Sequence, residues 1–258
     1  MRALALFAFA ACVQAAPPLP PEGVAFEPLY PLWTDGAQKR RWLWLPPGTA
    51  IDTSRPDAWD FPPGTRAWKE FSHGRRIETR VIERLADDTW RYAAYVWNAE
   101  GTRARAADER GETIAVESAP GGTYRVPSRA DCLACHEGAP VPILGYSAIQ
   151  LGRTAIAAPS ERARAALGYL HGNCGHCHND SGPLASTELA LAQRAAAPRA
   201  SAARTAATLA HRRDDVVRRL RSANPYVRMP PLGVRVTDAE GVALIESFLQ
   251  SLPREPSP

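Results

Sequence analysis

The N-terminal half of the chain alternates between apolar and polar residues with the period of two that is typical of β-strands. Three such runs occupy residues 41–45, 76–81 and 92–97, and turns rich in proline, glycine and aspartate separate them. We therefore expect an antiparallel β unit of the sandwich type. All seven tryptophans lie between residues 33 and 97, and their alternation with charged residues predicts one buried face of a sheet.

From Ser160 onwards the apolar residues recur with a helical period. Ser160 is a good N-cap residue, and Ala163, Leu167 and Leu170 mark one face of a predicted helix that runs into Cys174. This change of period coincides with a change of composition, because alanine and arginine dominate the following stretch. We take the change as the start of a second unit.

A further helix is predicted near the C-terminus. Residues 237–240 form a capping box, and Pro253 would stop the helix. Its apolar face follows the helical spacing at Ile245, Phe248, Leu249 and Leu252. Two helices therefore bracket the C-terminal part of the chain.

The extreme N-terminus indicates export. Residues 1–15 resemble a signal peptide, in which Arg2 supplies the positive charge, a short apolar run follows, and residues 13–15 match an A-x-A cleavage site. The apolar run is about half of the roughly 20 residues that a membrane-spanning helix needs. We expect a periplasmic protein. Residues 9–12 also resemble a lipobox, which leaves open a lipid anchor at Cys12 and a membrane-tethered lipoprotein.

Composition excludes several classes of protein. With 45% apolar and 22% charged residues the chain is globular, and it is neither disordered nor a multi-span membrane protein. The formal net charge of +4 is spread along 258 residues rather than gathered in a basic block. Nucleic-acid binding is therefore not expected.

The other four cysteines form two C-x-x-C pairs, and a histidine follows each pair at once. These residues are Cys132, Cys135 and His136 in the first motif, and Cys174, Cys177 and His178 in the second. In this pattern the two thiols attach to one haem and the next histidine binds its iron. A zinc site, a thioredoxin-like redox pair or disulfides could use the thiols, but none of them requires the repeated histidine. We predict two covalently bound haem c groups.

Met229 is the candidate for the second axial ligand of one haem. It is the only methionine that remains when Met1 leaves with the signal peptide, and the two prolines after it stiffen its loop. A lone methionine usually fills a gap in a core. Its position between His178 and the last helix favours ligation of the iron that His178 binds.

The second axial ligand of the other haem is open. No methionine is left for the iron of His136, so the choices are a histidine, one of the lysines Lys39 and Lys69, or an open position. His171 is the first candidate, because it faces away from the core side of its predicted helix, and His73 is the next. Alternatively, His171 forms a hydrogen bond with a haem propionate or a backbone carbonyl.

These motifs resemble those of known proteins. Residues 158–252 resemble a class I cytochrome c domain, with a haem motif after the first helix, a Met-Pro-Pro loop and a closing helix. Most of the mature chain resembles a family of bacterial di-haem c-type cytochromes whose role is not established. The segments that carry this resemblance are residues 30–36, 41–48, 59–65, 77–80, 128–132 and 169–174. The resemblance implies a periplasmic haem protein with a β-rich N-terminal part, and it implies no substrate.

Together the patterns predict an α+β protein in four parts. We expect a signal peptide at 1–15, an antiparallel β-sandwich-like domain at 16–127, a first haem-attachment segment at 128–157 and an all-α cytochrome c domain at 158–254. The expected function is electron transfer with a redox protein partner. Two alternatives stay open: a peroxidase-like di-haem oxidoreductase with an open first haem, and a binding module whose β domain recognises a ligand.

Overall fold

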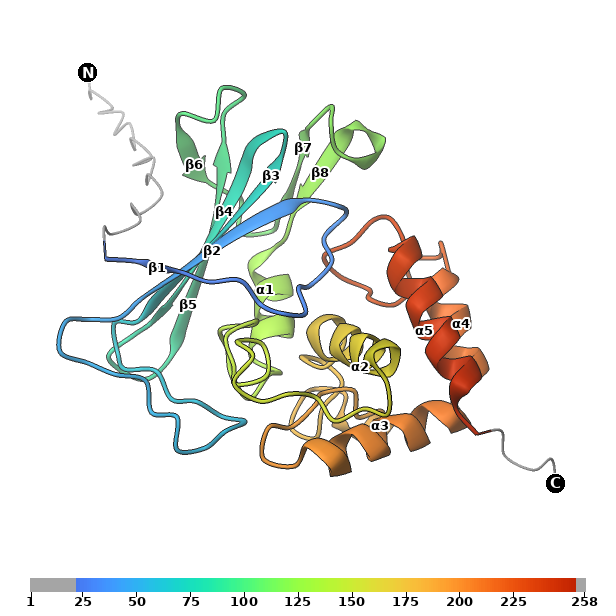
Figure 1. Ribbon diagram of the computed structural model, residues 1–258. Helices are drawn as coiled ribbons and strands as arrows, with labels where there is room; N and C mark the ends of the chain where they lie inside the picture. The colour runs from blue at the N-terminus through green and yellow to red at the C-terminus, as the bar shows by residue number, and fades with distance from the viewer. Residues whose placement is uncertain (1–21, 254–258) are drawn as a thin grey trace, which may run out of the picture.

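The computed structural model describes residues 22–253 of the chain (Figure 1). The predicted signal peptide at 1–15 and the candidate lipid anchor at Cys12 lie outside the described residues. Within residues 22–253, no helix combines the length and the apolar character needed to cross a bilayer.

Six strands form one antiparallel sheet, in which each strand pairs with its neighbours in the sequence. They are β1 (Val24–Ala25), β2 (Gln38–Trp44), β3 (Arg66–His73), β4 (Arg75–Arg84), β5 (Trp90–Trp97) and β6 (Ala104–Ala106). A separate hairpin consists of β7 (Glu112–Ala115) and β8 (Thr123–Val126). The three strands predicted from alternation are thus confirmed as β2, β4 and β5.

Five α-helices follow the strands. They are α1 (Arg129–His136), α2 (Glu161–Asn173), α3 (Pro198–His211), α4 (Arg213–Arg221) and α5 (Ala239–Ser251). Ser160 caps α2 as predicted, because its hydroxyl accepts a hydrogen bond from the Ala163 amide. The cap of α5 is Asp238, which accepts from the Gly241 amide, and not Thr237.

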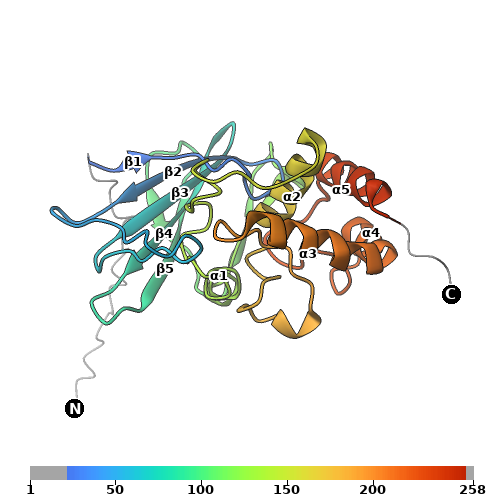
Figure 2. The same ribbon diagram turned by 60° about the horizontal axis from the view of Figure 1, so that its bottom comes forward.

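The expected β-sandwich is wrong. The strands form one meander and a small hairpin instead of two facing sheets. The inner face of the sheet is covered by α1 and by the irregular chain that follows it, so that Leu43, Ala67 and Ile82 share a core with Val141 and Ile143. In Figure 2 the sheet lies on one side of the molecule, α2 to α5 lie on the other, and α1 lies between them.

The expected all-α cytochrome c domain is also wrong, whereas a mixed α+β architecture agrees in part with the prediction: residues 22–253 are 27% helix and 20% strand. The helices do not form a unit of their own, because the segment before β2 packs into their core. A Cβ added to Gly168 would lie 2.0 Å from Cε1 of Tyr30. The Trp33 amide donates a hydrogen bond of 2.6 Å to Oδ1 of Asn173. Glycine at 168 therefore permits this close approach between α2 and the N-terminal segment.

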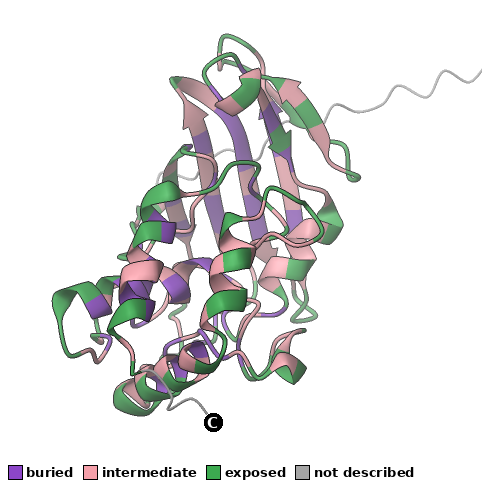
Figure 3. Ribbon diagram, turned by 90° about the vertical axis from the view of Figure 1, so that its right-hand side faces the viewer, coloured by how far each residue is buried: buried purple, intermediate pink, exposed green. Residues whose placement is uncertain are grey.

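The buried residues lie where the helices pack against each other and at the centres of the strands (Figure 3). Leu167, Leu170, Leu209, Ile245 and Leu249 form a buried core between the helices. The buried positions of the strands lie mainly at their centres, and the outward turns of the helices are exposed. The hydrophobic effect thus holds the sheet and the helices around the chain that connects them.

Candidate haem-attachment site

The first motif lies on α1, which ends at His136. The imidazole of His136 packs against Tyr92 of β5, with ring centroids 5.2 Å apart, and its Nδ1 lies 2.6 Å from the Pro142 carbonyl oxygen. A histidine that donates through Nδ1 presents the lone pair of Nε2, which is how most histidines bind a metal. Burial lowers the pKa of His136 to about 4, so the ring is neutral at physiological pH. This geometry suits an axial iron ligand.

The second motif lies directly after α2. The amides of Cys177 and His178 both donate to the Cys174 carbonyl, at 3.1 and 2.9 Å, which folds the motif into a tight turn. Burial and the nearby His176, Arg212 and Arg219 lower the pKa of His178. Its Nδ1 is buried and has no hydrogen-bond partner among the described residues. The Nδ1 hydrogen bond that orients His136 is therefore missing at His178.

The two motifs lie against each other. The side-chain amide nitrogen of Asn179 donates to the Gly138 carbonyl at 2.9 Å, and to the carbonyls of Gly175 and His176 at 3.0 and 3.2 Å. A hydrogen bond with Cys177 raises the pKa of Cys135 to about 12. We call this region, residues 134–138 and 174–183, the motif contact. It places both predicted haem-attachment sites side by side, although about 40 residues separate them in the sequence.

Met229 lies beside the second motif. Its amide donates to the Arg219 carbonyl at 3.1 Å, and its side chain lines a small cavity with Cys174, Tyr169 and Trp33. The loop before α5 is held from the other side by Asp35, whose carboxylate accepts from two backbone amides of that loop. The predicted ligand and the predicted attachment cysteine therefore share one cavity.

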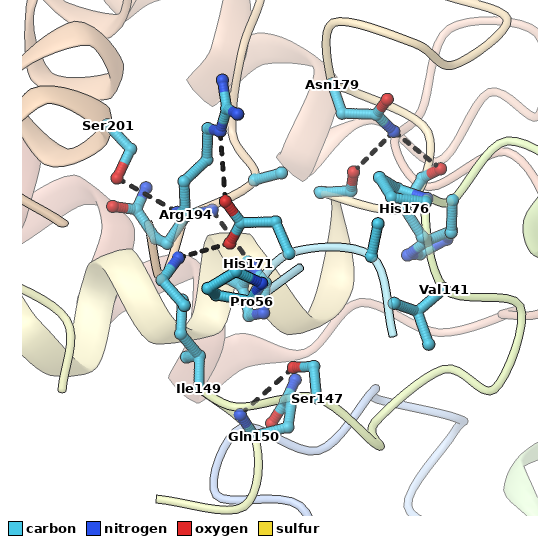
Figure 4. Close-up of a pocket in the computed structure, with 18 of the residues that line it drawn as sticks. Pro56, Val141, Ser147, Ile149, Gln150, His171, His176, Asn179, Arg194 and Ser201 are labelled. Atoms are coloured by element: carbon cyan, nitrogen blue, oxygen red, sulfur yellow. Dashed lines mark hydrogen bonds and ion pairs between the residues drawn. The ribbon is translucent and has the colours of Figure 1, made fainter. Parts of the chain in front are cut away.

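His171 lies elsewhere than expected. It lines a cavity of about 440 Å³ together with His176 and Asn179 (Figure 4), and not the cavity that Cys132 and His136 share. Its Nδ1 accepts a hydrogen bond of 3.1 Å from the Gln193 amide, which places the proton of the neutral ring on Nε2. The ring thus accepts a hydrogen bond from a backbone amide, which is neither the expected bond to the first iron nor the alternative bond to a propionate or a backbone carbonyl.

The other three candidates for the second axial ligand of the first haem are Lys69, Lys39 and His73, and they lie in different places. Lys69 lines the same cavity as Cys132 and His136. Lys39 donates to Leu32 and Thr34 instead, and His73 packs near Tyr124 at the end of β3, with ring centroids 6.3 Å apart. Of these three residues, the structure brings only Lys69 to the first motif.

Sequence patterns did not single out Arg41 and Arg80. Both line the cavity of the first motif together with Lys69. Each occupies an alternate strand position, which is the signal that could have placed them on one face of a sheet. Their buried location could not be read from the sequence, because arginine is mostly exposed.

Each motif carries the two thiols and the histidine that covalent attachment of one haem requires. The four motif cysteines are free thiols, and the described part of the chain holds no group of three or more His, Cys, Asp or Glu side chains placed to bind a metal. A haem iron needs only one or two ligands from the protein. The cavity beside Cys132 measures about 90 Å³, so the loops around it would have to move apart to admit a porphyrin.

We expect Asn179→Ala to lower the free energy of unfolding by about 1–3 kcal/mol, because it leaves carbonyls on both sides of the motif contact without this donor. Urea unfolding followed by circular dichroism measures this change. The control is Asn224→Ala at an exposed position, with an expected change below about 0.5 kcal/mol. Equal effects of the two substitutions would contradict a role of Asn179 in joining the motifs.

Comparisons with known proteins supply no assignment. No protein-family model, no curated protein and no solved structure matches this chain. A proposal of function therefore rests on the residues and their geometry.

Proposed function

We propose that this protein is an exported di-haem c-type cytochrome that carries electrons in the periplasm. The motif contact is the observation that supports this most, because it joins two complete C-x-x-C-H motifs whose histidines have lowered pKa values. Haem supplies an iron that changes between Fe(III) and Fe(II) with little change in its ligands.

At the first site, Cys132 and Cys135 would hold the haem and His136 would bind its iron. The Pro142 carbonyl fixes the orientation of the imidazole, and Tyr92 covers one side of the ring. A fixed, neutral ligand keeps the geometry of the iron unchanged between its two oxidation states, which favours rapid electron transfer.

At the second site, Cys174 and Cys177 would hold the haem, with His178 and Met229 as axial ligands. A methionine thioether favours Fe(II) and therefore raises the reduction potential. The bonds of the loop to Arg219 and Asp35 keep Met229 close to Cys174. The two sites would thus differ in potential, which gives electron flow between them a direction.

The cellular setting is part of the proposal. Covalent attachment suits the periplasm, where a haem that dissociates would be lost, and the partner would be another redox protein. The signal peptide at 1–15 and the lipid anchor at Cys12 stay predictions.

A peroxidase-like di-haem oxidoreductase is the second candidate function. It is favoured by one observation: the cavity of the first motif is lined by no methionine, and besides His136 its only lining histidine is His176. The first iron would then keep an open position for a small oxidant such as peroxide. A high-spin ferric signal in the paramagnetic resonance spectrum of the wild-type protein would favour this function over the carrier.

Cys132→Ala with Cys135→Ala, and Cys174→Ala with Cys177→Ala, should each remove one haem from protein matured with haem and exported. The pyridine haemochrome assay with a protein determination should fall from two haems per chain to one, because each motif holds one haem. Cys12→Ala is the control, and it should keep both haems. A wild-type ratio near one, or full retention in either double variant, would disprove the two-haem assignment.

Met229→Ala should abolish the far-red band that a sulfur–iron bond gives in the oxidised protein, and it should lower one midpoint potential. Optical spectra and a redox titration measure both effects. Val236→Ala, at an exposed position in the same loop, serves as the control and should keep the band. An unchanged band in Met229→Ala would show that another group binds this iron.

A further inference from the structure

Three cations face each other across the inner side of the sheet. Arg41 of β2 lies opposite Lys69 of β3, and Lys69 lies opposite Arg80 of β4. Side chains that are directly opposite on neighbouring antiparallel strands have Cβ atoms about 4.5–5.5 Å apart, and like charges in such pairs repel each other. We call Arg41, Lys69 and Arg80 the cation row.

Only one member of the cation row has a carboxylate partner. Arg80 binds Glu78 through two hydrogen bonds of 2.7 and 2.9 Å. Glu78 also accepts from the hydroxyl of Tyr124 at 2.5 Å, so its oxygens are already engaged. Within residues 22–253, no hydrogen bond or ion pair is recorded for the side chains of Arg41 and Lys69.

Arg41 is buried and Lys69 is partly buried. Arg41 is 5% exposed, and the ammonium of Lys69 lies over the ring of Phe71, 5.1 Å from its centroid. Burial is the main cause that lowers the pKa of both residues. Because removing an unpaired charge from water is unfavourable, an anion bound between these two cations would stabilise them.

On the opposite face of the sheet, unlike the inner face, solvent-accessible arginines form ion pairs with glutamates of neighbouring strands. Arg40, which precedes Arg41 in β2, is exposed and still pairs with Glu70 at 2.5 Å. Arg66 of β3 pairs with Glu83 in the same way, at 2.9 Å. On the inner face, Glu78 and Glu27 attract Lys69 and Arg41 electrostatically, but neither carboxylate forms an ion pair or a hydrogen bond with these two side chains. Arg41 and Lys69 therefore remain available to bind a carboxylate from outside the strands.

The cation row faces the first haem-attachment site. Arg41, Lys69 and Arg80 line the same cavity as Cys132, Cys135 and His136. A haem bound to those cysteines brings two propionate carboxylates, which equal in number the two cations without a partner. Arginine binds carboxylates through two parallel hydrogen bonds, and lysine acts as a point charge.

We propose that Arg41 and Lys69 bind the two propionates of the haem that is attached to Cys132 and Cys135. This inference rests on the proposed function, because it requires a haem at the first motif. The cations neutralise the propionates and so stabilise the reduced form of the iron relative to the oxidised form. The unpaired charges on the sheet become part of the cofactor site.

Arg41→Gln and Lys69→Gln, made in the haem-matured protein, test the inference. Both variants should keep two haems per chain and show a lower midpoint potential for one haem, equivalent to a change of about fivefold in its reduction equilibrium constant. Infrared redox-difference spectra of protein with ¹³C-labelled haem carboxyl groups should show shifted propionate bands. Arg40→Gln, which removes the adjacent cation on the opposite face, should change neither the potential nor the bands. Arg41→Lys keeps the charge and should give a smaller shift of potential than Arg41→Gln.

Several results would overturn the inference. With two haems retained, an unchanged potential and unchanged carboxylate bands in both glutamine variants would show that the propionates bind elsewhere. A high-spin first haem in Lys69→Gln alone would show that Lys69 binds the iron. A wild-type potential that responds to inorganic phosphate at constant ionic strength, with no response in the variants, would show that a free anion occupies the cation row. Absence of a haem at the first motif in the wild-type protein would instead disprove the proposed function.

Discussion

A buried side-chain amide joins the chain after α1 to the second C-x-x-C-H motif. Asn179 is 7% exposed, and its side-chain nitrogen donates to the carbonyl of Gly138, which follows the first motif, and to carbonyls of the second motif. Buried carbonyls need donors, so neither the end of α1 nor the turn after α2 can move away without leaving polar atoms unsatisfied. Since α1 packs on the sheet and α2 packs on α5, this contact also fixes the sheet relative to the helices. The N-terminal segment adds a second connection through Tyr30 and Trp33.

The positively charged side chains on the inner face of the sheet lie beside the first C-x-x-C-H motif. The strands direct Arg41 and Lys69 towards the first motif, where their side chains form no hydrogen bond or ion pair with the described residues, although the carboxylates of Glu27 and Glu78 lie near enough to attract them. A fold selected only for stability would place apolar residues or carboxylates there, since buried unpaired charge is unfavourable. The sheet therefore has a role beyond support: it supplies positive potential at one attachment site, while Met229 distinguishes the other.

Local signals in the sequence were sufficient for the elements and for the chemistry of the motifs, but not for their arrangement. Alternation predicted β2, β4 and β5, and the Ser160 cap predicted the start of α2. Alternation defines two faces without saying what covers each of them. The sandwich was therefore not a reliable inference. Trp42, Trp44 and Trp68 do pack on one face of the sheet, but only Trp68 is buried there, and Arg41 is buried on the other face. Contacts such as those of Asn179 join residues far apart in the chain, and spacing alone cannot reveal them.

The central claim is that two haems sit next to each other at the motif contact. Paramagnetic resonance of the fully oxidised wild-type protein tests it most directly, by comparison with the sum of the spectra of two single-haem variants. If the motifs touch as Asn179 and Cys177 indicate, magnetic interaction between the two irons should make the wild-type spectrum differ from that sum in line shape and relaxation. A wild-type spectrum equal to the sum, with unchanged relaxation, would contradict the account.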